Sequence, residues 1–159
     1  MHLSETTIIA ASPRKVFAFF VGMEENYLRW HRDHIVFRWL DKGRQEVGSR
    51  FYFEERIHGQ ILKRVMFYTK VETNQLIEFV PDNPVIRFFL RSVRFEMLPV
   101  GDGCRFTQTL HIRIGPIGHW LNRRGFEAVE KHMREEGENL KAILEEYGLS
   151  AGGHWKEQQ

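Results

Sequence analysis

A histidine and a glutamate four residues apart near the C-terminus are the residues most suggestive of chemistry. His132 and Glu136 lie in a segment with helical periodicity, and Glu136 falls on its apolar face. That face comprises Val129, Met133, Leu140, Ile143, Leu144 and Tyr147. A buried carboxylate needs a cation, a metal or a proton, so an arginine such as Arg64 or Arg91 is one candidate partner. A metal ion is the other, because two side chains on adjacent helical turns can bind one ion.

A strand predicted over residues 49–58 supplies a further carboxylate. Alternation places Phe51, Phe53 and Glu55 on one face, which we take to be the core face, and leaves Glu54 facing solvent. A bulge in this strand would exchange the two glutamates and make Glu54 the inward carboxylate. His34, which follows a predicted short helix, is the remaining candidate ligand.

The predicted set therefore contains His34, Glu55, His132 and Glu136, from three separate elements. Two imidazoles and two carboxylates suit zinc, and iron or manganese also accept such ligands. The two carboxylate charges would neutralise a divalent ion. The sequence thus predicts a metal site assembled from distant parts of the chain.

The elements that must position these residues follow from patterning and turn chemistry. Ser12-Pro13 is a typical helix start, a second short helix is expected over 24–32, and a long helix begins near Ile117 and extends from Gly125 to Tyr147. Seven strands are predicted, over residues 3–10, 35–41, 49–58, 61–72, 76–80, 87–98 and 104–114. This order favours an α+β fold in which a curved antiparallel sheet wraps around the long helix.

Composition narrows the class of protein. The chain has 159 residues, 42% of them apolar and 13% aromatic, which suits one domain over residues 1–150 and a disordered tail over 151–159. The net charge of +2 is mixed along the chain, so we expect no nucleic-acid binding. A single cysteine, Cys104, excludes an intramolecular disulfide. Without a signal or membrane-spanning segment, we expect a cytoplasmic protein that binds no membrane, and a homodimer remains open.

The order of elements resembles the START-like or SRPBCC superfamily, which has the helix-grip fold. The start Ser12-Pro13-x-x-Val16-Phe17 is typical of that superfamily, and the likeness covers roughly residues 3–147. The resemblance implies a seven-stranded sheet around the C-terminal helix, two short helices after the first strand, and a deep cavity for an apolar or aromatic ligand. The fold alone leaves function open.

Three motifs resemble the zinc-dependent diacetylphloroglucinol hydrolase family, which includes phloretin hydrolase. They are Tyr27-x-x-Trp30-His31-x-x-His34, Glu55-x-Ile57-x-Gly59 and His132-x-x-x-Glu136. The resemblance implies zinc held by two histidines and two glutamates, which fall on the set named above. It also implies cleavage of the carbon–carbon bond between an acyl group and a phenolic ring.

Other residues would complete such a site. His31 or Asp33 would orient His34 or transfer protons. We expect a cavity lined by Tyr27, Phe37, Phe51, Phe53, Phe67, Phe89, Phe95, Phe106 and Trp120. Phe37 stands where the family would have a polar substrate contact. The remaining polar candidates are Tyr52, Tyr68 and His111, although alternation places His111 on an exposed face.

The leading hypothesis is a metal-dependent, zinc-preferring hydrolase of a small acylated phenolic or polyketide-type compound. Zinc polarises carbonyl groups and lowers the pKa of water toward about 7, and both effects assist a retro-Claisen cleavage. The alternative is a carrier or sensor that binds a small hydrophobic molecule without metal or turnover. A third hypothesis is a protein that binds the metal but has lost catalysis.

Overall fold

The structure, a computed structural model, describes the backbone of residues 1–157 and the side chains of residues 1–146. Its seven strands are β1 (His2–Ile9), β2 (His34–Trp39), β3 (Arg50–Ile57), β4 (Gln60–Glu72), β5 (Leu76–Pro81), β6 (Leu90–Val100) and β7 (Gly103–Ile112). Its helices are α1 (Pro13–Val21), α2 (Met23–Trp30), α3 (Pro84–Phe89), α4 (Pro116–Leu121) and α5 (Arg123–Glu157). This is the element order that the sequence predicts, with α3 added and the C-terminal helix divided into α4 and α5.

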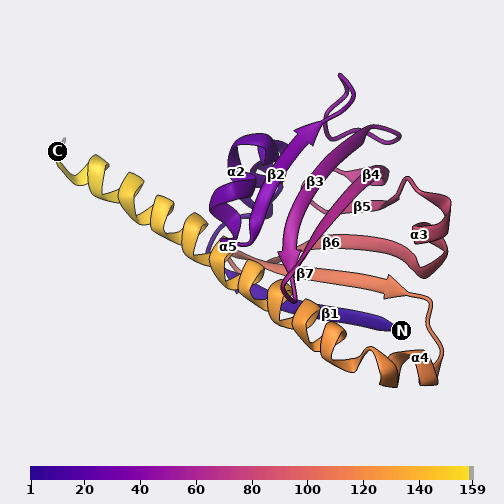
Figure 1. Cartoon of the computed structure of the whole chain (residues 1–159). Helices are drawn as coiled ribbons and strands as arrows, with labels where there is room; N and C mark the ends of the chain where they lie inside the picture. The colour runs from indigo at the N-terminus through magenta and orange to yellow at the C-terminus, as the bar shows by residue number, and fades with distance from the viewer. Residues whose placement is uncertain (158–159) are drawn as a thin grey trace.

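The strands form one antiparallel sheet in the order β1-β7-β6-β5-β4-β3-β2. The sheet curves around α5, which contacts β1 near one edge and β3 near the other (Figure 1). Helices α1 and α2 connect the two edge strands, β1 and β2, and α2 also contacts α5. The predicted α+β helix-grip architecture is therefore confirmed. No described helix contains an apolar stretch long enough to span a bilayer.

Local sequence explains how α1 begins and which face it buries. The Ser12 hydroxyl accepts a hydrogen bond from the Lys15 amide, and Pro13 occupies the first helical turn, where no amide hydrogen is needed. Phe20 then packs in the core between Phe95 and Phe106, with ring centroids 4.9 and 5.5 Å away. The first helix thus fills part of the space enclosed by the sheet.

The β3–β4 hairpin fixes the register that the site depends on. His58 and Gly59 occupy the turn with φ of 52° and 74°, as a two-residue turn between right-twisted strands requires. Glu55 consequently pairs with Leu62, and Phe51 with Met66. Strand β3 contains no irregularity in its pairing with β4, so Glu55 keeps the inward orientation predicted by alternation.

Helix α3 is a departure from the predicted organisation. The Asn83 side chain accepts hydrogen bonds from the amides of Val85 and Ile86, and Pro84 opens the helix. The sequence predicts a strand over residues 87–98 and no helix directly before it. The prediction is wrong there, since β6 begins at Leu90.

The C-terminal helix is divided near its start. Asn122 ends α4, and α5 begins at Arg123. The side chains of residues 147–159 lie outside the description, and so do residues 158–159 altogether. The predicted tail over residues 151–159 falls in this region and, like the domain boundary at residue 150, stays a prediction.

Three side-chain hydrogen bonds, two of them buried and one partly buried, hold α5 in place. The Trp30 indole donates to the backbone carbonyl of Glu136, and the Asn139 amide donates to the carbonyl of Trp30, each over 2.9 Å. From the sheet, the Gln108 amide donates to the Met133 carbonyl, also over 2.9 Å. These contacts fix both the rotation and the axial position of the helix, and therefore the direction in which its inward side chains point.

Candidate metal centre

A bulge at the start of β2 decides where His34 points. Val36 pairs with Glu54 and Phe37 with Phe53, so strict alternation would turn His34 away from the inner face. The pairing shifts by one residue between His34 and Val36, and His34 pairs directly with Glu55. The imidazole is therefore buried beside the Glu55 carboxylate.

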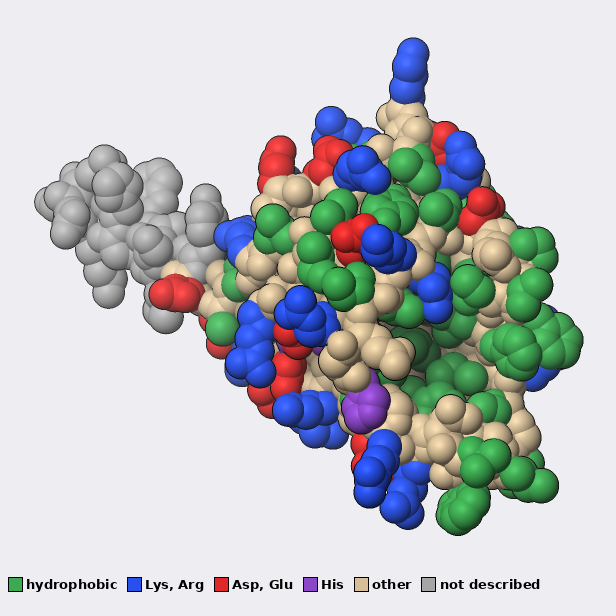
Figure 2. Space-filling model, in the orientation of Figure 1, with side chains coloured by type: hydrophobic (Ala, Val, Ile, Leu, Met, Phe, Trp, Pro, Cys, Tyr) green, Lys and Arg blue, Asp and Glu red, His purple; other side chains and the backbone are tan. Residues whose placement is uncertain are grey.

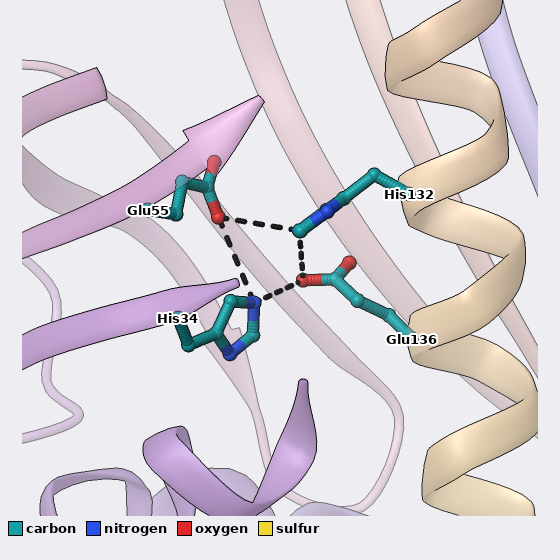
Figure 3. A group of neighbouring side chains, drawn as sticks. All are labelled: His34, Glu55, His132 and Glu136. Atoms are coloured by element: carbon teal, nitrogen blue, oxygen red, sulfur yellow. Dashed lines mark hydrogen bonds and ion pairs between the residues drawn. The ribbon is translucent and has the colours of Figure 1, made fainter. Parts of the chain in front are cut away.

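Helix α5 completes the cluster with the two residues singled out from its periodicity. His34 Nε2 lies 2.8 Å from Glu136 Oε1 and 3.7 Å from Glu55 Oε2. His132 Nε2 lies 3.3 Å from Glu136 Oε1 and 3.5 Å from Glu55 Oε2. One ligand atom from each of the four residues lies within 4.8 Å of all the others. Figure 3 shows the four side chains converging from two strands and one helix.

The hydrogen bonding of His34 fixes its tautomer. Its Nδ1 lies 2.8 Å from the Tyr27 carbonyl oxygen, which can only accept, so Nδ1 carries a hydrogen. Nε2 is then the nitrogen that faces the carboxylates of Glu136 and Glu55. In a neutral imidazole that nitrogen bears a lone pair, and only a proton or a cation can bridge it to a carboxylate. Orientation of a ligating histidine by a backbone carbonyl is common in metal sites.

The second imidazole, that of His132, has a buried nitrogen without a hydrogen-bond partner among the described residues. This nitrogen is Nε2, and two carboxylates lie near it. Burial lowers the pKa of His132, but the neighbouring Glu136 and Glu55 outweigh that effect and raise it to about 10. For Glu136, burial raises the pKa, and the two histidines prevail and lower it. A proton on His132 thus offsets part of the carboxylate charge, and the donor set equally fits a divalent metal ion.

The arginine alternative is not observed. Among the described side chains, the ion pairs of Glu55 and Glu136 are made with histidines. Arg64 lines the cavity and donates to the Lys63 carbonyl, while burial lowers its pKa. Glu54 also lies elsewhere, since its carboxylate accepts from the Tyr52 hydroxyl and lies 3.7 Å from Lys63.

His31 and Asp33, the predicted catalytic residues, lie behind the cluster and not in the cavity wall. His31 is only 2% exposed; its Nε2 bonds Glu135 over 2.7 Å, and its Nδ1 accepts the Asp33 amide hydrogen over 2.9 Å. Its ring packs against His132 with centroids 4.1 Å apart. His31, Asp33 and His132 also present ligand atoms within 4.8 Å, but the amide occupies His31 Nδ1. Of the two predicted roles, this geometry favours positioning.

Tyr27 contacts the cluster through both its ring and its hydroxyl. The ring stacks on His34 with centroids 3.9 Å apart, and the hydroxyl donates to Glu55 Oε2 over 3.3 Å. Burial, followed by the negative charges of Glu55 and Glu136, raises the pKa of Tyr27 far above its usual value. The phenol therefore remains protonated and is a hydrogen-bond donor at the cavity wall.

Glu55, His132 and Glu136 form part of the wall of a cavity of about 490 Å³ between the sheet and α5, and His34 does not line it. Figure 2 shows a recess lined by hydrophobic side chains on this face of the molecule. Predicted lining residues that do line it are Tyr27, Phe37, Phe51, Phe53, Phe89 and Phe95. The volume and the aromatic walls suit a small planar molecule.

Three residues predicted to line the cavity lie elsewhere. Phe67 lies on the outer face of β4, between the inward-facing Met66 and Tyr68, and beneath Arg87. Phe106 is fully buried, but its ring packs against Phe20 of α1 and does not line the cavity. Trp120 is 70% exposed on α4.

Several polar cavity residues lack a clear sequence signal. Gln45 lies in the loop between β2 and β3, where no periodicity indicates its direction, and Gln108 is a polar residue on the inner face of β7. Tyr68, named among the polar candidates, lines the cavity. Tyr52 faces outward and His111 is exposed, as alternation indicates.

Comparison with known proteins identifies the relatives of this chain. The sequence profile of the family described as "Polyketide cyclase / dehydrase and lipid transport" matches residues 1–145. The chain belongs to this family. Family membership supports the predicted START-like superfamily, whereas the likeness to the zinc hydrolases rests on the sequence motifs alone. A search of curated proteins finds no match.

Solved structures of the same fold are similar over most of the chain. The ZhuI aromatase/cyclase from Streptomyces sp. R1128 has a TM-score of 0.70 at 12% identity, covering 91% of this family member and 93% of ZhuI. A START superfamily protein from Mycobacterium smegmatis has a TM-score of 0.68 at 17% identity, with 92% and 98% covered. Aha1 from Colwellia psychrerythraea, described as a dimer, has a TM-score of 0.59 at 16% identity, with 91% and 96% covered.

Proposed function

We propose that this family member is a zinc-dependent hydrolase that cleaves the carbon–carbon bond between an acyl group and a phenolic ring. The observation that carries the proposal is the convergence of His34, Glu55, His132 and Glu136 on one point, with the last three in the wall of an aromatic cavity. The orphaned His132 Nε2 and the fixed tautomer of His34 support a cation at this point. Iron or manganese would satisfy the same ligands.

Zinc held by these four residues would polarise the acyl carbonyl and lower the pKa of water. Hydrolysis would add the hydroxyl of water to the acyl carbon and a proton to the ring carbon, and so release a carboxylic acid and a phenol. The protein must hold the ring and supply the proton. The aromatic cavity walls provide stacking surfaces for a planar ring.

Tyr27 is the residue best placed to act on the substrate. Its hydroxyl is protonated, lies 3.3 Å from Glu55 Oε2 and belongs to the cavity wall. It would donate a hydrogen bond to the substrate oxygen and help to orient the acyl group. His31 would act through His132, because it packs on that ring and does not reach the cavity.

The test combines metal analysis with turnover. Protein purified without chelator should contain about one zinc per chain, and His132→Ala should lower zinc affinity at least about 100-fold. His119→Ala, which removes an exposed imidazole, is the matched control. Incubation with a panel of acylphenols should release a carboxylic acid from some members with wild type and not with His132→Ala. Absence of stoichiometric metal in wild type would remove the basis of the proposal.

A second candidate function is transport or sensing of a hydrophobic molecule. The observation favouring it is the largely apolar wall, in which Phe37 packs beside Tyr27 where a hydrolase would need a polar contact. A carrier would be stabilised by ligand without turnover or metal. Because ZhuI is an aromatase/cyclase, the panel should also include a poly-β-ketone, for which ring closure would redirect the assignment to cyclisation.

A further inference from the structure

A second polar position lies in the cavity wall, away from the metal centre. Gln45 is in the loop between β2 and β3 and is 9% exposed. Its side chain lines the cavity, and neither Oε1 nor Nε2 has a hydrogen-bond partner among the described residues. A buried amide without partners destabilises the fold, whereas leucine would fill similar space without that cost.

The strand geometry places Gln45 at the opposite end of the cavity from the metal centre. Glu55 lies near the far end of β3, and the loop that contains Gln45 leads into the beginning of this strand. Phe51 and Glu55, both on the inner face, are separated by roughly 13 Å at the usual rise of a strand. The metal centre and the Gln45 amide therefore lie toward opposite ends of β3 in the wall of the same cavity.

Tyr68 provides a second polar group at the Gln45 end. It lines the cavity, and its backbone is tied to the loop by hydrogen bonds from Gly48 N to Tyr68 O and from Tyr68 N to Ser49 O. Burial raises the pKa of Tyr68, so its hydroxyl remains protonated. Between this end and the metal centre, the inner face of β3 presents the rings of Phe51 and Phe53.

We propose that Gln45 and Tyr68 form a distal subsite that binds a neutral hydroxyl group at the far end of a rod-shaped aromatic ligand. The amide can donate from Nε2 and accept at Oε1, and a phenolic hydroxyl satisfies both. A neutral amide would not repay the desolvation of an ionised group, which excludes a carboxylate at this end. The proposal rests on the proposed function in that the same cavity binds the ligand, and it adds the ligand class: a two-ring acylphenol with its carbonyl toward the metal centre.

Two probes that differ by one hydroxyl test the subsite: 4-acetylbiphenyl and 4-acetyl-4′-hydroxybiphenyl. Their dissociation constants are measured by calorimetry with wild type, Gln45→Leu and Gln60→Leu, the last being an exposed glutamine as control. Wild type and Gln60→Leu should prefer the hydroxylated probe by about tenfold or more, as expected for a buried hydrogen-bonding site. Gln45→Leu should lose that preference, bind the plain probe at least as well, and have a higher Tm without ligand.

The same measurements in zinc and in a chelator separate this proposal from the metal chemistry. If the hydroxyl preference persists in chelator and disappears in Gln45→Leu, the subsite is supported even where no zinc binds. An unchanged preference in Gln45→Leu overturns it, as does failure of wild type to bind either probe. Should Gln45→Leu not fold, Tyr68→Phe gives the same comparison, and an unchanged preference in that variant also overturns the proposal.

Discussion

The indole Nε1–H of Trp30 donates a hydrogen bond to the backbone carbonyl oxygen of Glu136 over 2.9 Å. Trp30 ends α2, His34 begins β2 four residues later, and Glu136 is a member of the cluster on α5. A single buried hydrogen bond therefore couples the placement of a strand ligand to that of a helix ligand. The Asn139 amide, which donates to the carbonyl of Trp30, makes the connection reciprocal.

Replacing Trp30 by phenylalanine should affect both stability and metal binding. The variant loses one of the two hydrogen bonds that the Glu136 carbonyl accepts, the other coming from within α5, and the smaller ring leaves a void in the core. The free energy of unfolding should therefore fall by about 1–3 kcal/mol. Zinc affinity should fall about tenfold, as for other contacts that orient ligands. Urea denaturation and a competitive zinc titration measure the two effects. Trp120→Phe, at an exposed site, should change neither, and an unaltered zinc affinity in Trp30→Phe would show that the contact does not position the centre.

The metal-free protein should have a pH-dependent stability set by His132 and Glu136. The raised pKa of His132 contributes stability that is complete below 6.5 and is lost as the pH rises through about 10. The lowered pKa of Glu136 contributes stability that is complete above 4.5 and is lost as the pH falls. In chelator, the Tm should therefore be highest between pH 4.5 and 6.5. A Tm that rises steadily from pH 6.5 to 9 would contradict this arrangement.

Zinc binding at pH 8 should release a proton from His132. With its pKa near 10, the metal-free imidazole is protonated at that pH, and a ligating nitrogen must be free of its proton. Calorimetry in buffers with different ionisation enthalpies counts the protons released. The His132→Gln variant should release about one proton fewer per zinc ion bound than wild type does, even if its affinity for zinc is lower.

Gly137 allows α5 to approach β1 beside the cluster. A Cβ at this position would clash with Thr7 Oγ1, and Gln108 Nε2 also lies nearby. Gly137→Ala should lower the free energy of unfolding by about 1–3 kcal/mol, as overpacking does. Gly125→Ala, on the same helix and with nothing near its Cβ, should instead raise it by about 0.5–1 kcal/mol. Urea denaturation of the two variants measures the sign of each change in the free energy of unfolding. Equal changes in both would show that the close approach of α5 to β1 is not the cause.

Tyr27→Phe should separate substrate binding from metal binding. The four proposed ligands remain, so the zinc content should be unchanged, while turnover of any acylphenol substrate should fall about 10²-fold because a hydrogen-bond donor is lost. Tyr52→Phe removes a hydroxyl from the outer face of the same sheet region and is the matched control. Full turnover by Tyr27→Phe would show that other residues donate the hydrogen bond to the substrate and orient its acyl group.

Much of the candidate site followed from periodicity. Glu136 stood out because a carboxylate interrupts an apolar helical face, and it is only 7% exposed in the structure. Glu55 followed from alternation along β3, which holds because the hairpin at His58-Gly59 introduces no bulge into that strand. Both inferences use local geometry that neighbouring elements do not alter.

The features that the sequence does not predict depend on tertiary contacts, or on a helix N-cap whose residues are also typical of a turn. Asn83-Pro84 starts a helix and not a simple turn because the Asn83 side chain satisfies the first amides. Phe106 is inward-facing, but α1 covers it, and alternation does not distinguish a core residue from a cavity residue. Gln45 lies in a loop, where neither period applies.

The bulge between His34 and Val36 makes the length of this segment as informative as its residues. Deleting Ile35 would place His34 directly before Val36, and plain alternation would then keep the imidazole opposite Glu55 and facing inward. A chain of the present length that lost the bulge would instead turn the imidazole outward, while every candidate ligand stayed in the sequence. Homologues that keep all four side chains are therefore expected to build the centre either with the present spacing and a bulge or with one residue fewer before Phe37 and no bulge. Spacing at this edge strand is thus a criterion for dividing the family into lineages that build the centre in these two ways.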